Sequence, residues 1–181
     1  NWVIKKIESI IFKKVDFLIV TSEKFLSCHY NKIYCGKAPF VLENKPLSQM
    51  VPKRDLALLK RDSMSKLTVG IVGSLVQKEP YRALFEAVKD SDVIEVAVYG
   101  MGTCQGFVEE YARNYKNIHY YGSYNFFNDS AKIYGSIDCL YMVYDTTNGS
   151  LNNKVALPNK LYEAMYFQVP VITSKDTYLA E

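Results

Sequence analysis

Short strand-like runs of apolar and aromatic residues alternate with helical patterns along residues 66–181, and this alternation restricts the chain to few folds. The runs predict buried strands at 67–73, 93–99, 118–122, 138–144 and 169–172. The helical patterns cover 80–89, 105–115, 128–136 and 158–168. Strands separated by helices form parallel sheets with helices on both faces. We therefore predict an α/β fold built on a Rossmann-like, doubly wound parallel sheet.

The stretch 157–174, LPNKLYEAMYFQVPVITS, combines the start of a helix with an internal carboxylate. Pro158 can begin a helix without losing a hydrogen bond, and Asn159 is a competent N-cap. As a surface charge, Glu163 in the first turns would contribute about 0.3–1 kcal/mol through the helix dipole. However, the polar loop 145–153 leads into helix N–H groups that can hold a phosphate, and a carboxylate one turn later can accept hydrogen bonds from two ribose hydroxyls. We prefer this second interpretation, a nucleotide-sugar site.

These residues resemble the donor-site helix and the following strand of the retaining glycosyltransferases of family 4. The resemblance is carried by PNKLYEAM at 158–165 and by VPVITS at 169–174. It implies the two-domain GT-B fold and sugar transfer from a UDP- or GDP-sugar, with no cofactor and no metal. It also implies a set of donor contacts at the helix start: Pro158, Asn159, Lys160, Leu161 and Glu163. In the implied reaction, Glu163 anchors the ribose.

A second part of the expected donor site follows the first strand of this region. Gly73 at the strand end would let a ligand approach the backbone, and Lys78 before a helix suits a diphosphate. A solvated surface lysine is the alternative for Lys78, but beside the motif at 158–165 we prefer pyrophosphate binding. The resemblance implies that Lys78 and Glu163 act in catalysis. The family usually has an arginine directly after this glycine, and Ser74 stands there instead.

Two further loops match the expected donor site. Gly100 and Met101 follow the second strand and resemble the glycine-containing turn of the family's donor domain, although Gln105 stands where a dinucleotide fingerprint needs its third glycine. Ser123 and Tyr124 follow the third strand, where the family contacts the nucleobase. Simple packing is the alternative for Tyr124, because the chain contains 15 tyrosines.

One departure from the family concerns the sugar. Family members commonly carry another glutamate eight residues before the one that matches Glu163, and Val155 occupies that position. Either another residue, such as Asp145 or Asn153, contacts the sugar, or this subgroup lacks the contact.

The alternation of strands and helices also predicts how the chain is divided. The resemblance implies that residues 1–45 are the end of a second Rossmann-like domain, which binds the acceptor. Prolines and charges at 46–65, with one short helical patch at 56–59, indicate an interdomain linker. Residues 66–181 then form the donor-binding domain, truncated at its C-terminal end, so we expect a piece of a longer protein.

The first 46 residues contain three predicted elements. A helix at 2–14 has an apolar face, which we expect to dock against a sheet, with contact to a membrane surface as the alternative. A strand at 15–22 and a helix at 23–30 follow. The segment 41–46 resembles the one that closes the first domain of the family.

Composition excludes several other classes of function. The chain is 49% hydrophobic and 23% charged, which is ordinary for a globular protein, and its net charge of +3 is too small to indicate nucleic-acid binding. Its four cysteines lack CxxC spacing, so we expect reduced thiols in a cytoplasmic protein. Neither of its two histidines has metal-ligand spacing. No apolar stretch approaches the roughly 20 residues of a membrane-spanning helix.

We therefore predict a fragment of a GT-B glycosyltransferase of the hexosyltransferase type, which transfers a sugar with retention to a carbohydrate or lipid-linked acceptor. Family habits suggest bacterial cell-surface polysaccharide or glycoconjugate synthesis at the inner face of the membrane. We expect the fragment to bind the donor or the free nucleotide weakly and not to catalyse transfer. An epimerase of the same fold is the alternative enzyme, and the departures at Ser74 and Val155 motivate a non-catalytic nucleotide-sugar-binding protein. The Pro158 motif and the lack of an acidic cluster count against a receiver or flavodoxin-like module.

Overall fold

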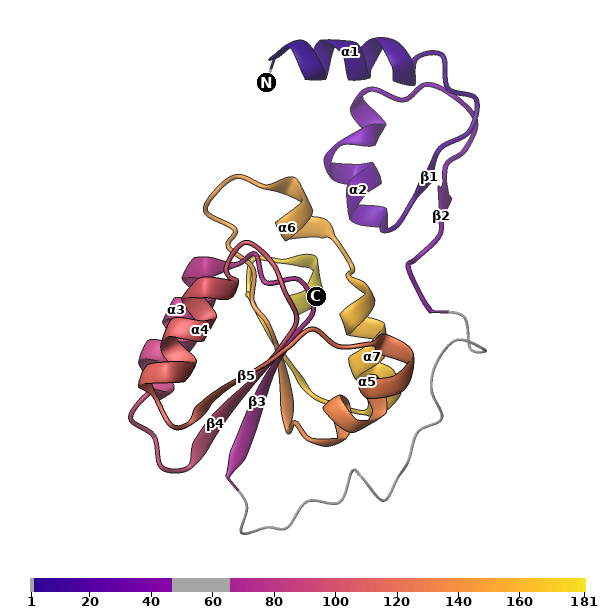
Figure 1. Ribbon diagram of the computed structural model, residues 1–181. Coiled ribbons are helices and arrows are strands. Elements are labelled where there is room, and N and C mark those ends of the chain that lie inside the picture. The colour runs from indigo at the N-terminus through magenta and orange to yellow at the C-terminus, as the bar shows by residue number, and fades with distance from the viewer. Residues whose placement is uncertain (1, 47–65) are drawn as a thin grey trace.

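The computed structural model describes residues 2–46 and 66–181 (Figure 1). Residues 66–181 contain a parallel five-stranded sheet with the order β5-β4-β3-β6-β7. Its strands are β3 Leu67–Val72, β4 Ile94–Tyr99, β5 Ile118–Gly122, β6 Cys139–Met142 and β7 Val171–Thr173. Its helices are α3 Lys78–Val88, α4 Gln105–Asn114, α5 Phe126–Gly135, α6 Leu151–Val155 and α7 Asn159–Phe167, and the 3-10 turn η4 Tyr178–Ala180 follows. The predicted doubly wound α/β fold is confirmed.

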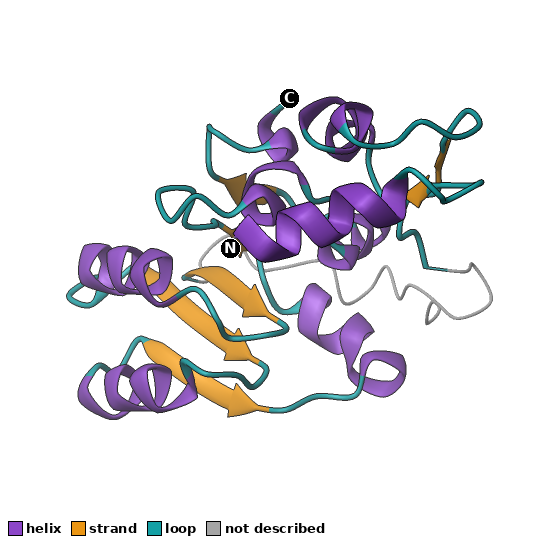
Figure 2. Cartoon of the chain, turned by 90° about the horizontal axis from the view of Figure 1, so that it is seen from above, coloured by secondary structure: helices purple, strands orange, loops and turns teal. Residues whose placement is uncertain are grey.

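The strand order reverses in the middle of the sheet. From β3 the chain moves outward through β4 to β5, then returns to β6 on the other side of β3. Helices α3 and α4 cover one face, and α5 and α7 cover the other (Figure 1), and the view from above also shows helices on both sides of the strands (Figure 2). In such sheets ligands bind beyond the carboxyl ends of the strands, at the point where the order reverses. Here that point lies between β3 and β6.

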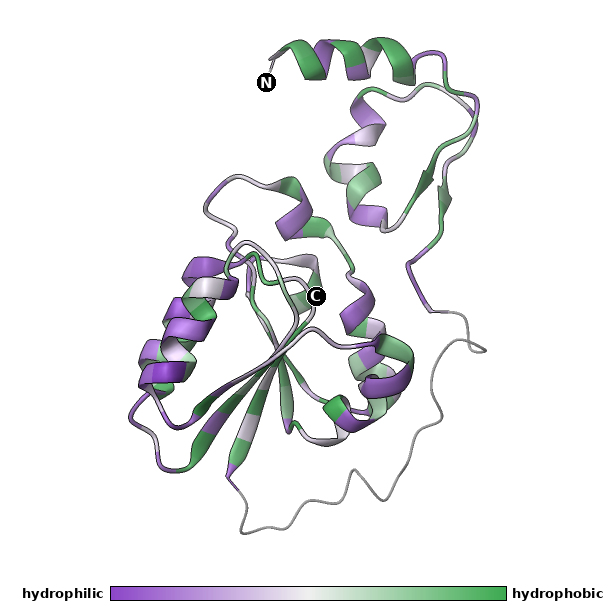
Figure 3. Ribbon diagram, viewed as in Figure 1, coloured by the Kyte–Doolittle hydropathy of each residue, from purple (hydrophilic) through white to green (hydrophobic). Residues whose placement is uncertain are grey.

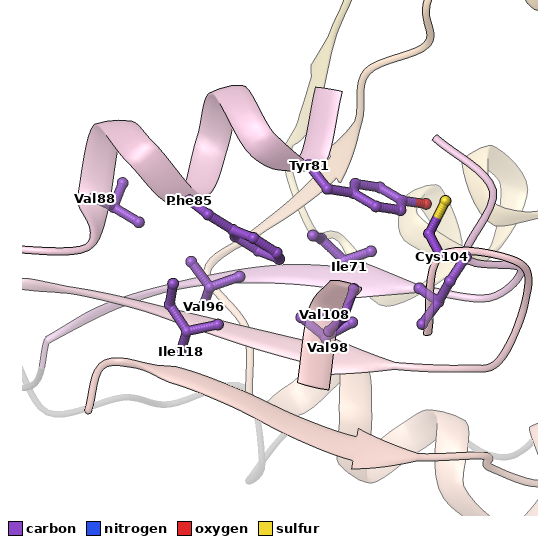
Figure 4. Packing of buried hydrophobic residues seen from close by; sticks show 10 residues of the cluster. Ile71, Tyr81, Phe85, Val88, Val96, Val98, Cys104, Val108 and Ile118 are labelled. Atoms are coloured by element: carbon purple, nitrogen blue, oxygen red, sulfur yellow. The ribbon is translucent and has the colours of Figure 1, made fainter. Parts of the chain in front are cut away.

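The face under α3 and α4 is a closed apolar core (Figure 4). Phe85 of α3 is 0% exposed and lies among side chains from three neighbouring strands and α4. The buried members of this cluster are Ile71, Leu75, Tyr81, Phe85, Val88, Val96, Val98, Cys104, Val108 and Ile118. Both helices bury one stripe of apolar side chains, so burial of apolar area holds this layer together.

The face under α5 and α7 has an apolar cluster with polar groups inside it. Tyr134 of α5 and Phe167 of α7 are stacked, with ring centroids 5.0 Å apart and planes 6° from parallel. Ala164 and Leu140 complete the contact between the helices and the sheet. Glu163, also on α7, is buried beside them. This face therefore contains a charged residue, which a purely structural layer would avoid.

Residues 2–46 contain five short elements: α1 Trp2–Phe12, β1 Ile19–Val20, α2 Glu23–Cys28, the 3-10 turn η1 Tyr30–Lys32, and β2 Phe40–Val41. Strands β1 and β2 form a small parallel sheet. This part contacts the larger domain through polar groups, because Ser22 Oγ donates to the Val155 carbonyl at 2.8 Å and Lys24 Nζ to Glu181 Oε1 at 2.7 Å. The assignment of residues 1–45 to an acceptor domain stays a prediction.

The prediction that α1 docks its apolar face on a sheet is wrong for the described part of the chain. Helix α1 has no buried residue, and Ile4, for example, is 61% exposed. Figure 3 shows hydrophobic positions on α1, β1 and β2. The helix is held instead by a tilted ring contact between Phe12 and Tyr30 and by a contact of Glu8 with His29. No described sheet lies against the apolar stripe.

Several element boundaries differ from the sequence prediction. Helix α3 begins at Lys78, so Pro80 is its third residue, where its missing N–H still costs no intrahelical bond. In α7, Pro158 occupies the N-cap position and Asn159 is the first helical residue, the reverse of the expected roles. The polar loop after β6 contains the short helix α6, which the prediction missed. The predicted linker at 46–65, apart from its first residue, and its helical patch at 56–59 lie outside the described residues.

Within residues 2–46 and 66–181, no helix is both long enough and apolar enough to cross a membrane.

Candidate functional site

The loops after β3, β4 and β5 are held together by backbone hydrogen bonds. The Gly73 N–H donates to the Tyr99 carbonyl at 2.8 Å, and the Gly100 N–H donates to the Gly122 carbonyl at 2.7 Å. Gly100 has φ +136°, and a Cβ there would lie 1.8 Å from the Gly73 carbonyl oxygen. Only glycine fits such a conformation at such a contact. The chemistry-bearing loops are therefore fixed to one another at the carboxyl edge of the sheet.

These loops line a pocket of about 350 Å³. Its lining residues are Gly73, Ser74, Gly100, Met101, Ser123, Tyr124 and Phe126. All of them except Phe126 are among the donor contacts that the sequence predicts. Burial raises the pKa of Tyr124 to about 12, with the charge of Glu163 as a smaller cause, so this phenol keeps its proton and can donate a hydrogen bond.

A second pocket, of about 210 Å³, lies at the point where the strand order reverses. It shares Ser74 with the first pocket. Its other lining residues are Val76, Gln77, Tyr81, Tyr141, Met142, Val143, Tyr144 and Lys160. The two pockets thus form one bipartite space over the ends of β3, β4, β5 and β6. Hereafter we refer to them together as the bipartite pocket.

Lys160, from the first turn of α7, supplies a positive charge to this space. A Cβ built on Gly73 would lie 3.1 Å from Lys160 Cδ and 3.3 Å from Lys160 Nζ, so the lysine side chain passes directly over that glycine. Gly73 has φ +107°, which also requires glycine. Burial lowers the pKa of Lys160, and the charge of Glu163 opposes this shift. An anion bound here would favour the charged ammonium.

Glu163 lies one turn after Lys160 and is only 8% exposed. Its Oε2 accepts a hydrogen bond of 2.7 Å from the Tyr134 hydroxyl. Burial raises the pKa of Glu163, whereas the Tyr134 hydrogen bond and the Lys160 charge lower it. The predicted ribose anchor is therefore a buried carboxylate with a defined partner, and the surface-charge interpretation is wrong.

The other predicted residues of α7 divide between the surface and the core. Asn159 is exposed at the start of the helix, and Pro158 is partly buried at the N-cap. Leu161 packs against the apolar cluster of the α5–α7 face. Its N–H bonds the Pro158 carbonyl at 3.0 Å.

The structure does not bring Lys78 to the lining of either pocket. Its ammonium lies 5.4 Å from the centroid of the Phe107 ring, on the side of α3 that faces α4. Arg82 is placed over the same ring at 5.1 Å. This lysine is the first residue of α3, and the neighbouring aromatic surface holds it by a cation–π contact. Its proposed role on the diphosphate stays a prediction.

The loop between β6 and α6 uses its polar side chains internally. Asp145 Oδ1 accepts hydrogen bonds from the Thr147 hydroxyl at 2.6 Å and the Thr147 N–H at 2.9 Å, and these bonds lower the pKa of Asp145. Asn153 Nδ2 donates to the Asp145 carbonyl at 2.7 Å, and the Asp145 N–H donates to Gln77 Oε1 at 3.1 Å. Val155 is 5% exposed. A sugar contact from Asp145 or Asn153 stays a prediction.

Sequence reasoning missed several residues of the site. Gln77, Tyr144 and Phe126 line the bipartite pocket, and Tyr134 contacts Glu163. Gln77 and Phe126 lie beside predicted loops, so their proximity could have been inferred from position. Tyr134 precedes Glu163 by 29 residues, with no motif to connect them.

The fold resembles that of several solved glycosyltransferase structures. TarM from S. aureus, in complex with Fondaparinux, alpha-GlcNAc-glycerol and UDP, matches 96% of this chain with a TM-score of 0.63 and 16% identity. HepE from Anabaena, in complex with UDP and glucose, matches 92% with a TM-score of 0.62 and 14% identity. AviGT4, a glycosyltransferase involved in Avilamycin A biosynthesis, matches 92% with a TM-score of 0.61 and 13% identity.

This likeness shows the fold, the Rossmann-like arrangement of the GT-B glycosyltransferases. The chain spans only part of these proteins: 33% of TarM, 46% of HepE and 48% of AviGT4. No sequence family and no curated protein matches the chain at a significant level.

Proposed function

We propose that this chain is part of a glycosyltransferase and that residues 66–181 bind its nucleoside diphosphate sugar donor. The observation that carries the proposal is the bipartite pocket at the strand-order reversal, with Lys160 over Gly73 and the carboxylate of Glu163 one turn further along α7. A cation over a glycine turn, close to a helix N-terminus, suits a diphosphate, and a nearby carboxylate suits a ribose. The UDP in the complexes of TarM and HepE supports the same ligand class.

Within this proposal the residues have separate tasks. Ser74, Gly100 and Met101 contact the nucleotide from the loops after β3 and β4, while Ser123 and Tyr124 face the base. Glu163 accepts hydrogen bonds from the ribose. Lys160 neutralises the diphosphate, and it supplies the charge that the family's arginine would supply at the position of Ser74. The N-terminus of α7, at Asn159, adds its dipole.

Catalysis in this scheme acts on the leaving group. Negative charge grows on the departing diphosphate as the sugar–oxygen bond breaks, so a cation already in place stabilises the transition state more than the bound donor. The acceptor hydroxyl then attacks, and we propose retention at the anomeric carbon, as the family resemblance implies. We propose a carbohydrate or a lipid-linked molecule as the acceptor. The acceptor side of the reaction would use residues outside the donor-binding part.

A non-catalytic nucleotide-sugar-binding protein is the second candidate. The burial of Val155 favours it, because the position of the family's additional glutamate offers only an apolar side chain enclosed in protein. An assay of sugar transfer by the complete gene product separates the two: transfer supports the enzyme, and donor binding without transfer supports the binding protein.

Calorimetric titration of the 181-residue chain with UDP, GDP and their sugar conjugates tests the proposal directly. We expect one nucleotide to bind, and Glu163→Ala to weaken it by about 1.5–3 kcal/mol, the value of a hydrogen bond to a charged group. Glu110→Ala, which removes an exposed glutamate on α4, is the matched control and should leave the affinity unchanged. Failure of every nucleotide to bind would contradict the proposal.

A further inference from the structure

The carboxylate of Glu163 has two oxygens with different surroundings. Oε2 accepts the hydrogen bond from Tyr134. No described residue donates to Oε1, and this oxygen is not among the buried polar atoms that lack a partner, so it is not sealed from solvent. One oxygen is therefore held by the protein, and the other has no protein donor. Glu163 lines neither part of the bipartite pocket itself, but its charge acts on Tyr124 and Lys160, which do line it. A free carboxylate could rotate between several positions, and this one cannot without losing its bond.

Tyr134 itself has little freedom to move. Its side chain is 0% exposed, and its ring is stacked on Phe167 at 5.0 Å. A buried aromatic ring packed in this way has its hydroxyl fixed in space. The hydroxyl therefore defines where Oε2 of Glu163 must lie, because a hydrogen bond of 2.7 Å tolerates only small displacements.

Helix α5 connects this hydroxyl to the bipartite pocket. Tyr124 and Phe126, immediately before and at the start of α5, line the pocket, and Tyr134 lies about two turns further along the same helix. The carboxylate that it holds is on α7, next to Lys160. One rigid element thus spans from the pocket lining to the predicted ribose anchor.

We propose that Tyr134 is a positioning residue for nucleotide recognition: it occupies Oε2 of Glu163 and thereby directs Oε1 to one ribose hydroxyl. This inference rests on the proposed function. A purely structural alternative is that Tyr134 only satisfies a buried carboxylate. The two roles predict different effects of Tyr134 on nucleotide affinity. In a positioning role the effect depends on the ribose hydroxyl, and in a structural role it does not.

The test compares ligands with and without those hydroxyls. Calorimetry on the 181-residue chain measures the better-bound of UDP and GDP, and its 2′-deoxy and 3′-deoxy analogues. In the unsubstituted protein, we expect loss of the hydroxyl that Glu163 binds to reduce affinity about tenfold or more. Tyr134→Phe keeps the ring and its stacking but lacks the hydroxyl. We expect it to weaken the ribonucleotide about three- to tenfold and to leave the affinity for that deoxy analogue unchanged.

A matched control is present in the same domain. The Tyr111 hydroxyl donates to the carboxylate of Glu86 on the opposite face of the sheet, so Tyr111→Phe removes the same type of bond away from the pocket. It should change the affinity for no ligand. Thermal melts of each variant check that the fold is intact.

A second variant keeps the inference testable if Tyr134→Phe destabilises the protein. In Glu163→Ala, the carboxylate that accepts from Tyr134 is gone, so adding Tyr134→Phe leaves no buried acceptor without its donor. If Tyr134 acts through Glu163, its removal in this background leaves ribonucleotide affinity unchanged. A further loss there, or an equal loss for ribo- and deoxynucleotides in the single variant, would overturn the positioning role. If the unsubstituted chain binds no nucleotide, the proposed function itself fails and this inference fails with it.

Discussion

The two faces of the sheet are each covered by a pair of helices, but they differ in where they place a charged residue. In each pair a tyrosine hydroxyl of one helix donates to a glutamate of the other: Tyr111 of α4 to Glu86 of α3, and Tyr134 of α5 to Glu163 of α7. The first pair lies at the surface, outside a core of apolar side chains (Figure 4). The second lies within the protein.

Under the proposed function, this difference separates a face that stabilises the fold from a face that also binds the donor. Burying a carboxylate costs free energy that an apolar residue in the same place would not cost. The α3–α4 face avoids that cost, and its contribution is apolar area. The α5–α7 face retains the buried carboxylate beside the bipartite pocket, which is expected where a charged group has a task besides folding. Substitutions on the two faces should therefore affect different measurements.

The largest effect is expected on stability from the α3–α4 face. Phe85→Ala removes a fully buried ring from the centre of that core and should lower the free energy of unfolding by about 3–5 kcal/mol. Urea denaturation followed by circular dichroism measures it. Phe127→Ala, which removes an exposed ring at the start of α5, is the control and should cost much less. The nucleotide affinity of the folded Phe85→Ala protein should be unchanged. A large loss of affinity would contradict the proposal that the α3–α4 face contributes to stability and not to binding.

The next effect is on binding and compares two lysines. Lys160→Met removes the ammonium over Gly73 and should weaken nucleotide binding by about 1.5–3 kcal/mol, because a charge-assisted contact with the diphosphate is lost. Lys78→Met removes an ammonium that lies over Phe107 and should weaken binding less than about fivefold. Calorimetric titration of both variants measures the two losses of affinity. A larger loss from Lys78→Met would support the sequence-based role of Lys78 on the diphosphate and would contradict the role proposed for Lys160.

A smaller effect should appear in the pH dependence of stability, with opposite signs for the two glutamates. Burial raises the pKa of Glu163 above its ordinary value of 4.5, so its contribution to stability is complete below that pH and is lost as pH rises through the folded-state pKa. The bonds from Lys89 and Tyr111 lower the pKa of Glu86. The contribution of Glu86 is therefore present above pH 4.5 and is lost as pH falls through its lowered pKa.

Denaturation of the unsubstituted protein, Glu163→Gln and Glu86→Gln over a pH series measures these slopes. The stability of Glu163→Gln relative to the unsubstituted protein should increase as pH rises from 4.5 and then level off. The groups that face Glu163 are Lys160, Tyr134 and Tyr124, so the series is repeated in Lys160→Met to separate the lysine. Nucleotide affinity should rise over the same interval as the carboxylate ionises. A relative stability that falls with pH would contradict the assigned burial effect.

The sequence predicts the fold well because its signals are local. Each strand is a short run of mainly apolar and aromatic residues, and the parallel order follows from the helices between them. The same locality places Gly73, Ser74, Gly100, Met101, Ser123 and Tyr124 in one pocket, since loops at the carboxyl ends of adjacent parallel strands must converge. These residues could be identified without knowing any side-chain orientation.

The remainder depends on side-chain direction and on partners distant in sequence. Lys78 precedes α3 in the pattern, but whether its ammonium meets a pocket or the Phe107 ring is decided by how α4 packs. The apolar face of α1 predicts a partner, and no described sheet provides one. The role of Tyr134 depends on its contact with Glu163 of α7, which is distant in sequence. The neighbouring sequence of Tyr134 contains no pattern that predicts this contact.

The smallest expected effect is on the surface bond. Tyr111→Phe removes a hydrogen bond to Glu86, a carboxylate that water and Lys89 can still solvate, so we expect no resolved change in the free energy of unfolding. Tyr134→Phe leaves a buried carboxylate oxygen without its donor and should cost about 1–3 kcal/mol. Urea denaturation of both variants at neutral pH compares two chemically identical deletions. Equal changes in the free energy of unfolding would mean that burial does not distinguish the two hydrogen bonds. Glu163 would then not differ from a surface carboxylate such as Glu86.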